Sequence, residues 1–182
     1  MTAPSAPVAT NSWKLDPTHS TVEFSAKHMM FTTVKGRLAD VEGTVTLDGS
    51  TPDTARVDAT MKTASIDTRT EQRDQHLRSA DFLDADTYPA ITFKSTKITG
   101  PREHFTITGD LTIKTTTKSI TLDATYEGTG KDPWGGERMG VSAEGKIDRR
   151  EFGLTWNQAL EAGGVLVSNE IKIHLDAQLV RA

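Results

Sequence analysis

Polar and apolar side chains alternate along most of this 182-residue chain. In the run TVEFSAKH, for example, Val22, Phe24 and Ala26 share one phase, and the residues between them share the other. A period of two places successive side chains on opposite faces of a β-strand, so each run predicts a strand with one apolar and one wet face. The alternating runs cover residues 20–28, 56–63, 91–95, 104–108, 110–114, 119–127, 139–147 and 170–180.

Turn-forming residues separate these runs, as in LDGSTPD, ITGPRE and TGKDPWGGE. We therefore predict an all-β fold of about eight consecutive antiparallel strands, several of them about ten residues long. Such strands form either a sandwich or a closed barrel. Closure leaves no exposed edges, and about eight strands leave interior room for one small ligand.

Two segments interrupt the alternation. Thr68 followed by Glu71 matches a capping box, which predicts a short helical insertion near residues 69–84. The second segment, TWNQALEAGG at residues 155–164, predicts a short helix or turn that stops at the glycine pair. Around them we expect a disordered tail over residues 1–12 and a single domain over residues 13–182.

Composition excludes several classes of function. The formal net charge is −4, so we expect no nucleic-acid partner. Cysteine is absent, which removes disulfides, thiolate nucleophiles and Cys-based zinc sites. No stretch approaches the roughly 20 apolar residues that span a bilayer. The N-terminal MTAPSAPVATNSW lacks the basic and apolar regions of a signal, so we expect a cytoplasmic protein, or an exported one if a signal has been removed.

The stretch RTEQRDQHLRSADFLDADTYP, residues 69–89, is the strongest candidate for acid–base or metal chemistry. On one helix Asp74 and His76 point about 200° apart, so they cannot share a metal or a proton. Asp74 and Arg78 fall on one face, which predicts a surface ion pair. Since no H-x-H, H-E-x-x-H or D-x-D-x-D-G motif occurs, we interpret the stretch as a capped helix with solvated charges, with no catalytic residue and no metal site. Its inward apolar residues are predicted to be Leu77, Phe82 and Leu83.

Several other side chains have alternative roles. His28 falls in phase with the apolar residues of its run, so it is expected to point inward and either bond to backbone or contact a ligand head. Met30 fits equally a gap in the core or a pocket that adapts to an apolar chain. Trp13 and Trp134 are expected as structural plugs, whereas Trp156 lies in an irregular, mouth-lining segment and is the better candidate for a ligand contact.

Five longer segments occur in a fixed order: DPTHSTVEFSAKHMM (16–30), TVKGRLADVEGTV (33–45), SIDTRTEQRDQHLRSADFLDADTYPAITFKST (65–96), GDLTIKTTTKSITL (109–122) and IDRREFGLTWN (147–157). They resemble the YceI-like family of lipocalin-like, polyisoprenoid-binding proteins, over nearly the whole chain after the tail. The resemblance implies an eight-stranded antiparallel barrel with an apolar tunnel for an isoprenoid, an isoprenoid quinone or another long lipid. It implies no catalytic residue, no required cofactor and a homodimer, and a charged stretch that caps or lines the barrel.

We therefore expect a non-enzymatic protein that binds or carries a polyisoprenoid or similar long apolar lipid. Two alternatives stay open: an enzyme on a lipid-like substrate, with His28 or His76 as acid or base, and a structural or partner-binding barrel with a packed interior. The aromatic fraction of 6% opposes packing, because small side chains fill a wide barrel poorly. The predicted ligand-binding residues are Phe24, Ala26, His28, Met30, Leu38, Met61, Leu77, Phe82, Ile91, Phe93, Ile107, Leu111, Ile113, Ile120, Leu122, Met139, Val141 and Trp156.

Overall fold

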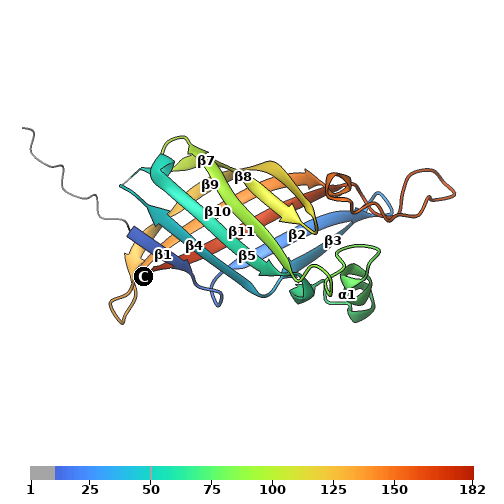
Figure 1. Ribbon diagram of the computed structural model, residues 1–182, viewed down its shortest axis with the longest axis horizontal. Helices are drawn as coiled ribbons and strands as arrows, with labels where there is room; N and C mark the ends of the chain where they lie inside the picture. Colours follow the sequence, from blue (N-terminus) through green and yellow to red (C-terminus); the bar gives the residue numbers. More distant parts are fainter. Residues whose placement is uncertain (1–10, 50) are drawn as a thin grey trace, which may run out of the picture.

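The computed structural model describes residues 11–49 and 51–182. Within these ranges, eleven strands form one antiparallel sheet that curls into an elongated barrel, and a single α-helix lies at one end (Figure 1). The strands are β1 (Asn11–Leu15), β2 (Thr21–His28), β3 (Thr32–Leu38), β4 (Val41–Leu47), β5 (Ala55–Lys62), β6 (Ile66–Asp67), β7 (Ala90–Thr99), β8 (His104–Ile113), β9 (Thr116–Lys131), β10 (Glu137–Asp148) and β11 (Glu170–Arg181). The helix α1 spans Glu71–Arg78, and short 3-10 helices span Pro52–Thr54, Thr63–Ser65 and Arg149–Phe152.

Strand β1 closes the barrel because it pairs with β4 on one side and with β11 on the other. The closed ring runs β1-β4-β5-β7-β8-β9-β10-β11. Beyond this ring, β2 pairs with β11 and β3, and β3 pairs with β6. Since β2 continues the course of β1, β3 leads into β4 and β6 follows β5, the wall consists of eight long strands, three of them broken. The predicted eight-stranded antiparallel, lipocalin-like barrel is confirmed.

Four strands lie outside the alternating runs that predicted the barrel. These are β1, β3, β4 and the two-residue β6, and in β3 and β4 Gly36 and Gly43 occupy positions where the alternation calls for an apolar side chain. Conversely, the runs at 104–108 and 110–114 are one strand, β8. Asn11 and Ser12, which were expected to belong to a disordered tail, pair with β4. The other residues of that expected tail, 1–10, lie outside the described part of the chain.

The predicted helical insertion is present, but the capping box is wrong. The helix begins at Glu71, and its N-cap, Thr70, makes no side-chain cap hydrogen bond. The hydroxyl of Thr68 instead donates to Oδ1 of the buried Asp74, at 2.6 Å. Between them Arg69 turns the chain with a φ of 62°. The hydroxyl of Thr68, which the capping box assigned to the start of the helix, is therefore bonded to the buried carboxylate of Asp74 instead.

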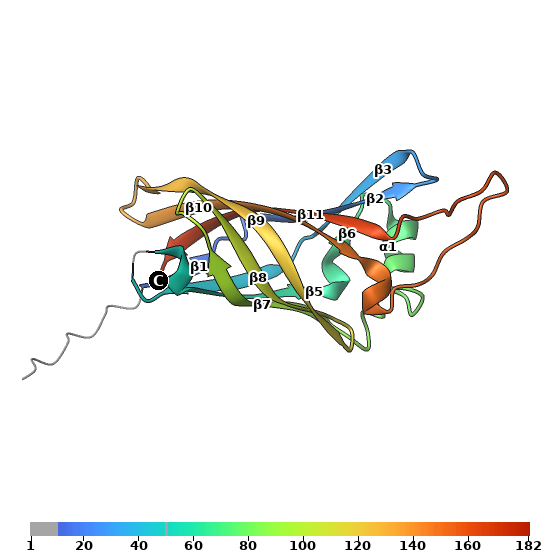
Figure 2. The same cartoon turned by 90° about the horizontal axis from the view of Figure 1, so that it is seen from above.

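The described residues 155–164 form no helix. They belong to a long irregular loop that projects from the same end of the barrel as α1 (Figure 2). Ala159 forms an isolated bridge with Val165. Gly163 and Gly164 have φ values of 87° and 90°, in the region that favours glycine, so the pair makes a tight turn at the loop tip instead of ending a helix.

Candidate binding cavity

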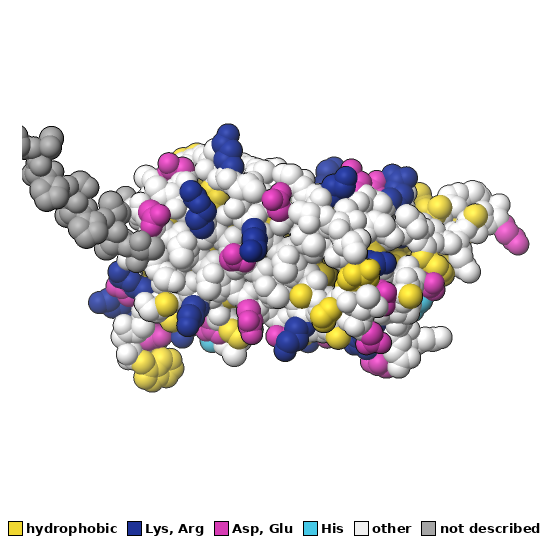
Figure 3. All heavy atoms as spheres, in the orientation of Figure 1, with side chains coloured by type: hydrophobic (Ala, Val, Ile, Leu, Met, Phe, Trp, Pro, Cys, Tyr) yellow, Lys and Arg dark blue, Asp and Glu magenta, His cyan; other side chains and the backbone are white. Residues whose placement is uncertain are grey.

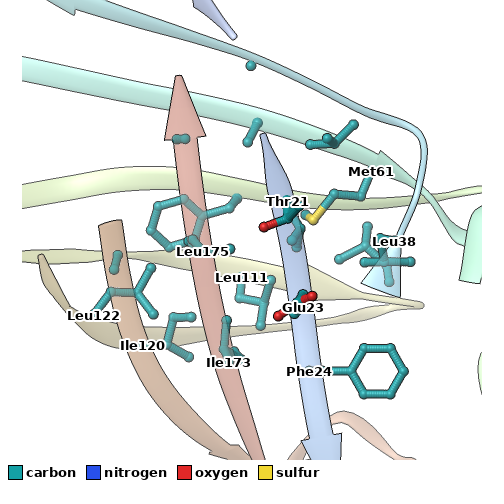
Figure 4. Close-up of a pocket in the computed structure, with 18 of the residues that line it drawn as sticks. Thr21, Glu23, Phe24, Leu38, Met61, Leu111, Ile120, Leu122, Ile173 and Leu175 are labelled. Carbon is teal, nitrogen blue, oxygen red and sulfur yellow. The ribbon is translucent and has the colours of Figure 1, made fainter. Parts of the chain in front are cut away.

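A cavity of about 780 Å³ runs inside the barrel. Leu111 of β8, Leu122 of β9 and Leu175 of β11 reach it from different strands (Figure 4). Pockets that hold small ligands typically measure about 300–1,000 Å³. The wall is predominantly aliphatic and aromatic, so it offers a ligand extensive contact and few hydrogen bonds. The cavity argues against the alternative of a packed interior.

The structure places every predicted ligand-binding residue except Met30 on the cavity wall. Met30 lies in the turn between β2 and β3, is 58% exposed and has a φ of 71°. Its side chain lies beside Gly164 of the projecting loop. The alternation that put Met30 inside stops at His28, where β2 ends. Contact of the other residues with a ligand stays a prediction.

Two glycines make room for the aromatic rings of the wall. A Cβ at Gly36 would stand 2.4 Å from Cζ of Phe24, and a Cβ at Gly109 would stand 2.4 Å from Cζ of Phe93. Gly36 is the cross-strand partner of Phe24, so this ring lies over the backbone of the neighbouring strand. Only glycine permits so close an approach. The two glycines thus keep both rings against the wall.

An aromatic and polar cluster lines the α1 end of the cavity. The ring of His76 meets those of Phe82 and Trp156 edge-on, with centroids 5.0 Å and 4.6 Å apart. Nε2 of His76 lies 2.9 Å from Oδ2 of Asp81. The interpretation of this stretch as solvated charges is therefore wrong for His76, which forms part of the cavity wall. Leu77, Phe82 and Trp156 lie on the wall as predicted.

Arg149, directly after β10, is a buried cation that also lines the cavity, with 3% of its surface exposed. Its guanidinium donates to the carbonyl oxygens of Leu154 (2.6 Å), Trp156 (2.9 Å) and Ser168 (2.9 Å). Within the described ranges it forms no ion pair with a carboxylate. Burial lowers the pKa of Arg149 from its ordinary value, but a guanidinium stays protonated in proteins. Arg149 therefore fastens both ends of the projecting loop to the end of the barrel.

The predicted surface ion pair between Asp74 and Arg78 is wrong. Asp74 is buried at 4% exposure, and its Oδ1 accepts from the backbone N–H and the hydroxyl of Thr68. Nε of Arg73 donates in turn to the Thr68 hydroxyl, at 2.7 Å. Arg78 pairs with Glu71 instead, at 3.4 Å. The charged stretch is thus attached to the barrel through a buried hydrogen-bond network.

Comparisons with known proteins agree with this geometry. The model of the YceI-like domain matches residues 13–179. Protein YceI of Shigella flexneri is 43% identical over 136 residues, which cover 75% of this chain and 71% of that protein. The chain belongs to the YceI-like family.

Solved structures share the barrel of this YceI-like protein. The YceI protein of Campylobacter jejuni is 32% identical, with a TM-score of 0.74 over 86% of this chain and 90% of that chain. A polyisoprenoid binding domain from Saccharophagus degradans has a TM-score of 0.67 over 93% of this chain and 98% of its own. At 13% identity, that second likeness shows the fold alone.

Part of the wall of this YceI-like barrel was not predicted. The alternation of β11 indicates clearly which of its residues point inward, although none of them was among the predicted ligand-binding residues. For β1 and β4 the local pattern is weak, and only ring closure brings β1 beside β11. The further wall residues from these strands and β5 include Trp13, Leu15, Val41, Val45, Val57, Ile171, Ile173, Leu175, Ala177 and Leu179.

Trp13, Trp134 and His28 each had a predicted role that the structure tests. Trp13 is buried, as expected of a structural plug, but Trp134 is 88% exposed, so the same prediction is wrong for it. His28 lines the cavity where β2 ends, and it is exposed. Its side chain makes no hydrogen bond to any described residue, so the predicted bond to backbone is absent.

At the opposite end of the YceI-like barrel, Arg138 joins Asp16 (2.6 Å) and Asp132 (2.9 Å). Hydrogen bonds from Thr18, His19 and Arg138 hold the pKa of Asp16 well below its usual range. These contacts tie the turn after β1 to the turn between β9 and β10.

Neither a cluster of metal ligands nor a membrane-spanning helix occurs in the described part of the chain. Across residues 11–49 and 51–182, no three His, Cys, Asp or Glu side chains gather as a metal site. Neither α1 nor any 3-10 helix of the described chain has the length and apolar character that a bilayer crossing requires.

Proposed function

We propose that this YceI-like barrel binds a polyisoprenoid, or a similar long apolar lipid, in its cavity and carries it chemically unchanged. The observation that supports this most strongly is the apolar cavity of about 780 Å³ inside the closed barrel. A long hydrocarbon chain matches a wall that provides contact area and few directed hydrogen bonds.

The energetics of burial favour a chain-like ligand. Each buried CH₂ equivalent contributes about 0.8 kcal/mol, so ten of them contribute about 8 kcal/mol. Association itself costs about 4–15 kcal/mol in lost freedom of motion. Affinity should therefore rise with chain length until the cavity is filled, and short lipids should bind weakly.

The Saccharophagus degradans domain of the same fold is described as polyisoprenoid binding, which supports this ligand class. Within the class, an isoprenoid quinone is the ligand to test first. Its ring carbonyls accept hydrogen bonds, and its ring can pack against aromatic side chains. His76, Phe82 and Trp156 offer both kinds of contact at the α1 end of the cavity. The ring would occupy that end, and the tail would lie between the strands.

Two neighbouring residues of β5 test the proposal. Ala59 lines the cavity, whereas Thr60 is exposed. Tryptophan at position 59 would occupy ligand space, but tryptophan at position 60 would stand in solvent. Loss of room for about two CH₂ groups corresponds to about a tenfold loss of affinity. We expect native mass spectrometry with a prenyl quinone to show a one-to-one complex for wild type and Thr60→Trp, and at least this loss for Ala59→Trp. Undiminished binding by folded Ala59→Trp would place the ligand elsewhere.

The His76–Asp81 pair on the cavity wall is the observation that favours a reaction on the lipid as a second candidate. Extraction of the lipid after prolonged incubation separates the two functions. A carrier returns a lipid of unchanged mass. A product that forms with wild type but not with His76→Ala would establish the enzyme instead.

A further inference from the structure

The turn between β2 and β3 exposes three consecutive large apolar side chains. Met29, Met30 and Phe31 are 40%, 58% and 72% exposed. Hydrophobic side chains are visible on the surface at this end of the molecule (Figure 3). Scattered single apolar residues are normal on protein surfaces, but a contiguous group marks a surface that contacts something else.

The backbone holds this apolar tip outward. Met29 and Met30 have φ values of 51° and 71°, which residues other than glycine rarely adopt. The N–H of Met29 donates to the carbonyl of Leu166 at 2.8 Å, and His28 forms a bridge with Val167. The tip is thus fixed to the projecting loop, and its exposure does not come from a loose turn.

Trp134 provides the contrast at the other end of the barrel. It is more exposed, at 88%, but it is a single apolar residue in the DPWGG turn. Asp132 in that turn accepts hydrogen bonds from the backbone N–H groups of Trp134 and Gly136. Among the described residues, only the β2–β3 end combines consecutive large exposed apolar residues with a connection to the cavity.

That connection is direct. His28 is exposed and also lines the cavity, and the half-buried Leu166 and Val167 of the adjoining loop line it as well. The cavity wall therefore leads to the residues that hold the apolar tip. A lipid chain that enters here from a bilayer would pass from one apolar medium to another.

Positive charge next to the β2–β3 tip indicates which kind of bilayer the tip would contact. Lys27 lies opposite Thr33 and Lys35 lies opposite Ser25, so the two lysines are diagonal neighbours on the outer face of the β2–β3 hairpin. Neither lysine forms an ion pair with a described residue. The projecting loop adds one exposed carboxylate, Glu161, which opposes this charge. An anionic lipid surface complements the lysines.

We propose that the β2–β3 tip, Met29 to Phe31, inserts into the surface of an anionic bilayer and sets the mouth of the cavity on it for lipid exchange. The exchange step rests on the proposed lipid-binding function, but the contact with the bilayer is measurable without it. Insertion of Phe31 and attraction of the two lysines act together, so the contact should weaken as ionic strength rises.

Vesicle flotation of the full chain tests the proposal, with phosphatidylcholine vesicles compared with mixed phosphatidylcholine and phosphatidylglycerol vesicles. We expect binding to the mixed vesicles, lowered about tenfold by Phe31→Ser and unaffected by Trp134→Ser. Lys35→Glu should also lower binding about tenfold, whereas Lys97→Glu, a reversal at an exposed residue of β7, should have little effect. Glu161→Gln should strengthen binding about threefold.

Three results would overturn the proposal: no flotation of wild type, equal flotation of Phe31→Ser, or a dimer in solution that Phe31→Ser dissociates. The last would make the tip a contact between two copies of the chain. Native mass spectrometry with a prenyl quinone, on the same variants, keeps the two proposals apart. Phe31 lies outside the cavity wall, so Phe31→Ser should retain the quinone whether or not it floats.

Discussion

The wall built by β7 to β10 and the α1 end of the barrel stabilise the same cavity by different physical means. In the wall, consecutive antiparallel strands pair in long registers, and inward side chains such as Leu111 and Leu122 contribute through non-directional contact. At the α1 end, Asp74 and Arg149 are buried and bonded to specific backbone groups. The wall can therefore accept apolar groups of different shape, whereas the α1 end depends on hydrogen bonds of defined geometry.

This difference suggests a division of roles. A wall without directed bonds can accept any apolar tail of suitable length. An end fixed by hydrogen bonds can hold His76 and Trp156 in one arrangement, as recognition of a polar head requires. Substitutions at the end should therefore affect stability most, and substitutions in the wall should affect ligand affinity most.

The largest loss of stability is expected from Arg149→Met. This change leaves three carbonyl groups of the projecting loop without their charged donor, and each unsatisfied group costs about 1–3 kcal/mol. We expect a loss of at least about 3 kcal/mol in denaturant titrations, with a Tm lower by about 6–12 °C. Arg150→Met is the matched control, because Arg150 is exposed and pairs only with the nearby Asp148; its effect should stay within about 0.5 kcal/mol. Equal losses of stability in the two variants would show that the buried hydrogen bonds of Arg149 stabilise the α1 end no more than an exposed ion pair does.

Asp74→Ala should cost about 2 kcal/mol, because the N–H and hydroxyl of Thr68 lose their acceptor. Asp74→Asn keeps one acceptor oxygen and should recover most of this stability. Asp86→Ala, at an exposed carboxylate of the same stretch, should change stability by less than about 0.5 kcal/mol. Hydrogen exchange of α1 is the measurement, and protection of α1 that survives in Asp74→Ala would show that the network is dispensable.

Ile120→Ala tests the wall. The side chain of Ile120 already faces open space, so its truncation should cost only about 1 kcal/mol, below the range for tightly packed core sites. Affinity for a prenyl quinone should fall about threefold to tenfold, since the tail loses contact with this side chain. Thr121→Ala, on the outer face of the same strand, should alter neither quantity. A stability loss as large as that of Arg149→Met would mean that the wall is as specifically packed as the end.

The smallest effect concerns acid stability at the end opposite α1. Because its pKa is lowered, ionised Asp16 stabilises the folded state fully above the unfolded pKa of about 3.9, and this contribution is lost as pH falls through the lower folded value. Asp16→Asn should therefore be less stable than wild type at neutral pH, and the difference should shrink below about pH 4. The control is Asp123→Asn on the outer face of β9. A difference that persists unchanged in strong acid would contradict the ion-pair origin.

The same contrast explains what could be predicted from the sequence. A period of two fixes which side chains share a face, so Phe24, Ile113 and Leu122 could be placed on the wall from local pattern. Closure by β1 could not be seen locally, because it depends on pairing with β11 across the whole chain. Asp74 was predicted at the surface and Arg149 was not singled out, because their burial depends on carbonyl and N–H groups that other segments supply. Met30 was misplaced because alternation gives no sign of where a strand stops.

Identification of what the protein contains when purified without added lipid tests the central claim most directly. Native mass spectrometry would show any bound molecule, and release followed by tandem mass spectrometry would identify it. Lipid binding in the cavity predicts a stoichiometric species with a prenyl or comparably long apolar chain. A clean mass of the protein alone, unchanged after incubation with prenyl quinones and prenyl phosphates, would contradict it.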